Sequence, residues 1–149
     1  MSQALWAGGL HQTSYWNSYN GRKGGKNPIP QPATVTAMAA PELVRYVQER
    51  FDVEVKDLDF AGNSAPLAQP GDIIAYQWNK RDKQPFEPDH LAFVVSIADG
   101  NYPEVAEWGT APLRIPYQKR GWTWSELNGT WLQADNPKMV AKLLHFRNP

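Results

Sequence analysis

The sequence predicts an α+β fold in which a small antiparallel sheet packs against helices. Two observations favour this fold. Residues 41–51 place apolar side chains at helical spacing. Residues 72–78 and 90–97 have the apolar, β-branched composition of strands, and a polar loop joins them. Together these features indicate at least one helix beside an antiparallel pair of strands.

The chain begins with residues typical of the end of a helix. Ser2 to Ala7 would form its last turns, and Gly8 and Gly9 would stop it, because glycine is common just after a helix. Met1 lies where the middle of such a helix is expected. We therefore expect a truncated first helix, followed by a polar surface loop.

The second predicted helix runs from about Pro41 to Phe51. Proline suits the first position of a helix, because it has no N–H group to leave unbonded there. Leu43, Val44 and Val47 fall on the same face as Phe51, so this helix should pack on a core.

Three strands are predicted to form an antiparallel meander, over residues 72–78, 90–97 and 104–108. In the second strand, Leu91 and Phe93 should face the core. The opposite face, which carries His90, should line a cleft or lie under a helix. Residues 139–146 could be a last strand or a helix.

Length, charge and hydropathy exclude several classes of function. A length of 149 residues suits a single domain spanning 1–149. The net charge of zero argues against nucleic-acid binding, which usually needs a basic face. No apolar run has the length of a membrane span, and no signal peptide is recognisable at the start.

The residue types in the chain limit the catalytic, metal-binding and cofactor-binding sites that it can form. It has no cysteine, which excludes disulfides, thiolate metal sites and cysteine catalysis within these residues. Its three dispersed histidines form no metal-ligand cluster, and no glycine-rich loop has nucleotide-binding spacing. We therefore expect no metal and no other cofactor.

His90 is the leading candidate for chemistry, since imidazole transfers protons near neutral pH and this one starts a strand beside a polar loop. A structural, hydrogen-bonded histidine is the alternative. Glu107, on the predicted neighbouring strand, could orient the ring, or it could be a surface carboxylate. Asp72 is expected to cap a turn by bonding backbone N–H groups.

Tryptophans supply the candidate binding residues. Trp122 and Trp124 alternate along the chain and should share a face, where they could hold a sugar or a peptide. Packing in the core or at its rim is the alternative. Trp78 and Trp108, which lie at the ends of predicted strands, are the other two candidate binding residues.

The motifs Pro70-Gly-Asp-Ile-Ile and Asp89-His-Leu-Ala-Phe-Val-Val resemble the second half of the NlpC/P60 and CHAP superfamily of papain-like amidases. Within it, the start of the chain, with Gly8-Gly9 and Tyr15-Trp16, is most similar to the family named putative amidase domain. The resemblance covers residues up to about Thr110. It implies a papain-like fold and a bacterial secreted or cell-envelope location. The reaction it implies is hydrolysis of cell-wall peptides.

The resemblance implies that His90 is the general base and that Glu107 has the orienting role. The nucleophilic cysteine of the family would fall about three residues before Met1. Ser2 does not replace it, because five residues along a helix turn a side chain by about 140°. We therefore expect an amidase-like domain that is inactive as written, in effect a pseudoenzyme.

Two alternatives stay open. The chain could be a non-catalytic module that binds a peptide of peptidoglycan, another peptide or a glycan. It could also be an assembly component of a phage or secretion system, with a protein partner covering the side of the truncated helix.

Overall fold

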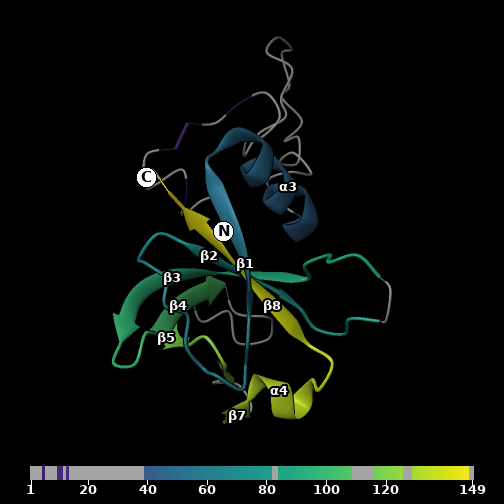
Figure 1. The fold of residues 1–149 in the computed structure, drawn as a ribbon, viewed down its shortest axis with the longest axis vertical. Coiled ribbons are helices and arrows are strands. Elements are labelled where there is room, and N and C mark those ends of the chain that lie inside the picture. Colours follow the sequence, from purple (N-terminus) through teal and green to yellow (C-terminus); the bar gives the residue numbers. More distant parts are fainter. Residues whose placement is uncertain are drawn as a thin grey trace, which may run out of the picture.

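The computed structural model describes residues 5, 10, 11, 13, 39–81, 84–108, 116–125 and 129–147, with only the backbone at 107, 108 and 116–118. Most of this part is a six-stranded antiparallel sheet with the order β1-β8-β2-β3-β4-β5 (Figure 1). Its strands are β1 (Val53–Leu58), β2 (Ile73–Gln77), β3 (His90–Ala98), β4 (Tyr102–Trp108), β5 (Pro116–Gly121) and β8 (Val140–Phe146).

The other described elements are short. Strands β6 (Trp124–Ser125) and β7 (Thr130–Trp131) form a two-stranded sheet. Helix α3 (Ala40–Arg50) lies on one side of the large sheet, and helix α4 (Leu132–Asp135) lies with β7 on the other (Figure 1).

The predicted α+β fold with a papain-like arrangement of sheet and helices is wrong. The described part of the chain is mostly antiparallel sheet and has only two short helices. Segments 53–58 and 116–121, which were not expected to be strands, extend the sheet to six strands. In addition, one face of the sheet is covered by aromatic side chains from connecting segments, so that face does not rest on a long helix.

Several local predictions are confirmed. The helix predicted over 41–51 is α3, and its buried residues are Leu43, Val44 and Val47. The predicted meander is the run β2-β3-β4. Segment 139–146 forms a strand, β8, which lies inside the sheet between β1 and β2.

The turn between β3 and β4 also follows from its residues. Gly100 and Asn101 both have positive φ angles, of 74° and 57°. Two successive positive φ values suit a tight hairpin turn, and glycine and asparagine tolerate them best.

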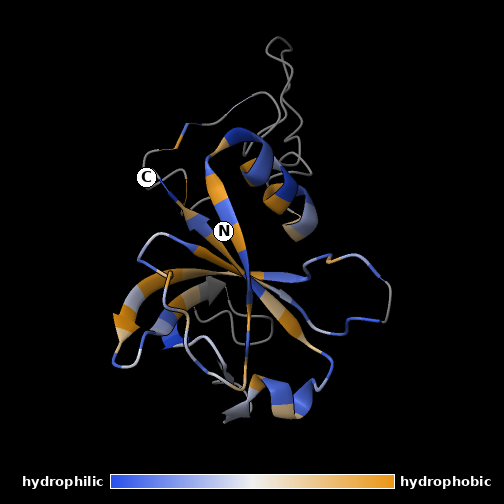
Figure 2. Ribbon diagram, in the orientation of Figure 1, coloured by the Kyte–Doolittle hydropathy of each residue, from blue (hydrophilic) through white to orange (hydrophobic). Residues whose placement is uncertain are grey.

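One face of the sheet packs on α3. Its core unites the apolar stripe of α3 with Ile73 and Ala75 of β2 and Leu144 of β8. Hydrophobic and hydrophilic residues alternate along α3 (Figure 2). Leu5, which is helical, is buried in the same cluster. Burying each such aliphatic side chain contributes roughly 1.5–3 kcal/mol.

The opposite face has a second core, built around aromatic rings. Ile74, Tyr76, Ala92 and Val94 of the sheet are buried in it. Trp122 covers them and is fully buried; its ring stacks on Phe60 with 4.9 Å between centroids, at 29°. Leu132 and Met139 complete this cover. The face of β3 that carries His90 was expected to line a cleft or lie under a helix. Its residues Ala92 and Val94 are instead buried in this aromatic core.

We predict that Trp122→Ala lowers the free energy of unfolding by about 3–5 kcal/mol, because it opens a large cavity in the aromatic core. Trp131→Ala is the matched control, since Trp131 is 51% exposed and touches Trp124 only edge to face. Its cost should stay below about 1 kcal/mol. Urea denaturation measures both, and equal losses would contradict this description of the core.

Candidate functional site

His90 is the first residue of β3, and the loop before it is fixed by hydrogen bonds to β2. The backbone N–H of Asp89 donates to the carbonyl of Tyr76 at 2.8 Å. The carboxylate of Asp89 accepts from the backbone N–H of Trp78 at 2.9 Å. His90 itself pairs with Tyr76 across the ladder. These contacts hold the imidazole at the rim of the sheet.

The ring of His90 lies in a cluster with the rings of Trp78 and Tyr76, and its centroid is 6.2 Å from that of Tyr76. It stacks on Trp78, with 5.6 Å between centroids and 29° between planes. Trp78 in turn stacks on Tyr76 at 5.6 Å, and the hydroxyl of Tyr76 donates to the carbonyl of Trp122 at 2.8 Å. Because Tyr76 is buried while His90 is partly exposed, this cluster holds the imidazole against a rigid support at the rim of the sheet. A positioned imidazole of this kind can transfer a proton to or from a ligand.

Glu107 lies on β4, the strand that pairs with β3, as the meander predicted. The paired register of these strands begins at Phe93 and Ala106, three residues along β3 from His90. The side chain of Glu107 lies outside the described residues. Its role as the orienting group stays a prediction.

The four tryptophans predicted to bind a ligand lie in different surroundings. Trp78 supports His90, and Trp122 is fully buried, which leaves no ring surface for a ligand. Trp124 packs edge to face against Trp131 at 5.0 Å, in the two-stranded sheet. The side chain of Trp108 lies outside the described residues. Trp122 and Trp124 therefore do not form one platform.

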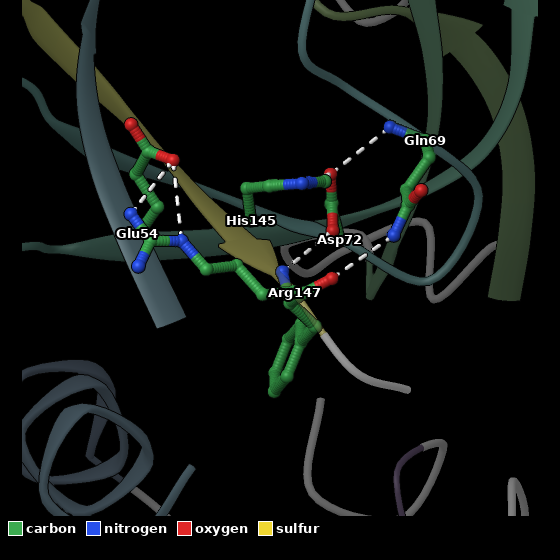
Figure 3. Close-up of polar contacts among 6 residues, drawn as sticks. Glu54, Gln69, Asp72, His145 and Arg147 are labelled. Carbon is green, nitrogen blue, oxygen red and sulfur yellow. Dashed lines mark hydrogen bonds and ion pairs between the residues drawn. The ribbon is translucent and has the colours of Figure 1, made fainter. Parts of the chain in front are cut away.

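A second imidazole, His145, contacts a buried carboxylate (Figure 3). Its Nδ1 lies 2.9 Å from Oδ2 of Asp72, which is fully buried. Asp72 also accepts from the backbone N–H groups of Gln69 and Phe146, at 2.9 and 3.0 Å. The bond to Gln69 confirms the predicted turn-capping role. The other two bonds tie the start of β2 to the end of β8.

Glu54 of β1 is the partner of His145 in the ladder and lies on the side away from Asp72 (Figure 3). Glu54 is paired with Lys56 and Arg147 at 2.7 and 3.1 Å. The hydrogen bonds from Lys56 and Arg147 hold the pKa of the Glu54 carboxyl below its usual range.

The sequence gives no local signal for the contact between His145 and Asp72, which are 73 positions apart. The pairing of Ile73 with Leu144 places Asp72 beside His145, which only the sheet register reveals. This pair lies four residues along β2 from Tyr76, roughly 13 Å at strand rise, so it is not the partner of His90.

No group of three or more metal-binding side chains occurs among the described residues. Within the same part of the chain, no helix has both the length and the apolar character needed to cross a membrane.

A family model described as "Putative amidase domain" matches residues 1–132. Searches of curated proteins and of solved structures found no match.

We predict that Asp72→Asn lowers the free energy of unfolding by about 2–4 kcal/mol, because an amide cannot accept all three hydrogen bonds of the buried carboxylate. Asp57→Asn makes the same change at a side chain that is 84% exposed and paired with Lys142. It should cost no more than about 1 kcal/mol. Comparable urea midpoints for the two variants would show that the Asp72 contacts contribute little.

Proposed function

The chain belongs to the putative amidase domain family, and from that premise we propose that His90 is the proton-transfer group of an amidase-like site directed at peptide amides. The observation that carries the proposal is the placement of His90, with its ring stacked on Trp78 and its backbone locked to β2. Such support keeps an imidazole oriented without immobilising it in the core. The cell wall is the source of peptides that the NlpC/P60 and CHAP resemblance favours.

The site lacks a thiol of its own. Because the sequence contains no cysteine, a thiolate cannot attack the amide carbonyl from within these residues. The chain as given therefore binds amide ligands beside His90 and does not hydrolyse them by itself. Glu107 is the residue proposed to fix the tautomer of His90.

A non-catalytic binding role is the second candidate. The observation that favours it is the exposed indole of Trp131, packed edge to face against Trp124. Exposed aromatic rings supply stacking surface for sugars and peptides at little entropic cost. Saturable binding of glycan fragments that is lost in Trp131→Ala would favour this role over a site centred on His90.

We predict that the purified chain releases no new amino groups from peptidoglycan peptides, because it has no cysteine thiol to pair with His90. His90→Gln should likewise release no amino groups above the background of the assay. Amine release by the unmodified chain that disappears in His90→Gln would contradict the proposed inactivity, and it would establish His90 as catalytic.

Binding should nevertheless depend on His90. Peptide ligands should change the fluorescence of Trp78, and His90→Gln should weaken that saturable response by about tenfold, the loss expected for one good hydrogen bond to a charged or polar ligand. His145→Gln, on the same face but remote from Trp78, is the control and should bind like the unmodified chain. Equal affinity of all three proteins would count against the proposed site.

A further inference from the structure

A cavity of about 700 Å³ lies on the α3 side of the sheet, away from the ring of His90. Its walls come from the N-terminal end of α3, the end of β2 and the loop that leads to β3. Gln77 lines it and alternates along β2 with Tyr76, whose ring lies in the other core. A cavity of this volume accommodates a small organic ligand or a short peptide.

Gln77 is the feature that points to a ligand. Its side chain is only 5% exposed, and its Oε1 accepts the backbone N–H of Glu87 at 3.2 Å. An N–H can only donate, so this bond fixes the orientation of the amide. The NH₂ group has no partner among the described residues. A buried donor without an acceptor is uncommon in proteins, and this one borders a cavity.

Further donors line the same cavity. Helix α3 begins at its wall, and the residue at the helix start, Ala39, makes no capping bond through its side chain. The first-turn N–H groups of Ala40 and Glu42 have no acceptor within the helix, and the helix dipole favours an anion there. Arg81 adds a guanidinium group from the loop. Together with Gln77, these donors match a carboxylate.

Carboxylates complete the lining. Glu87 and Asp89 border the cavity, and both residues are exposed. Their negative charges favour a cation beside the anion-binding end. A ligand with one carboxylate and one ammonium group would pair with both the hydrogen-bond donors and the two carboxylates of the lining.

We propose that this cavity binds a short peptide with free termini. Its carboxylate lies toward the start of α3, Gln77 and Arg81, and its ammonium group lies toward Glu87 and Asp89. This site is independent of the chemistry proposed for His90, because it uses the other face of β2.

Three alanine tripeptides test the proposal: one with free termini, one N-acetylated and one C-amidated. Calorimetry of the full chain should show saturable binding of the free peptide and at least about tenfold weaker binding of each capped form. In ¹⁵N NMR spectra, the side-chain NH₂ signals of Gln77 should shift with the free peptide. Equal affinities, absent binding, or unshifted Gln77 signals would overturn the proposal.

Variants locate the site. Arg81→Gln should weaken binding of the free tripeptide by about tenfold, whereas Arg50→Gln, which removes an exposed arginine at the other end of α3, should leave it unchanged. The NH₂ signals of Gln77, on the face of β2 opposite to Tyr76 and its ladder partner His90, report on this cavity alone, so failure here is distinguishable from failure of the His90 site. Equal effects of Arg81→Gln and Arg50→Gln would show that the cavity is not the binding site.

Discussion

Strand β2 is buried along its whole length, and both its edges are paired, with β8 on one side and β3 on the other. A strand buried on both faces needs a covering layer on each. Helix α3 supplies one layer, with an apolar stripe that meets Ile73 and Ala75. Trp122 and its neighbours supply the other, over Ile74 and Tyr76. The two cores share no side chains, but strands β2, β3 and β8 each contribute residues to both, and β2 lies between the other two.

Because side chains alternate along a strand, β2 also separates the two candidate sites. Tyr76 projects toward the aromatic core, and its ring contacts both Trp78 and His90. Gln77 projects the other way and borders the cavity at the start of α3. Asp72, just before the strand, fixes its start by bonding the end of β8. Small shifts of β2 would therefore disturb both sites together.

Local patterns predicted α3, β2, β3 and β4, because each has a clear hydrophobic period or turn chemistry. They missed β1, half of whose residues are charged and whose partner β8 lies far along the chain. They also missed β5, whose residues are largely polar. The fold-class prediction was wrong because these missed strands extend the sheet. At the site, the rim position of His90 and the turn contact of Asp72 were predictable. The contact with His145, the burial of Trp122 and the unpaired amide of Gln77 arise only from sheet register and packing.

Native-state hydrogen exchange tests the central place of β2 most directly, because it ranks the stability of each backbone hydrogen bond. The amides of Ile73–Gln77 should exchange most slowly, at a rate set by global unfolding, together with their partners in β3 and β8. Amides of the edge strands β1 and β5 should exchange faster. Exchange of the β2 amides as fast as that of β1 would contradict an architecture organised around β2.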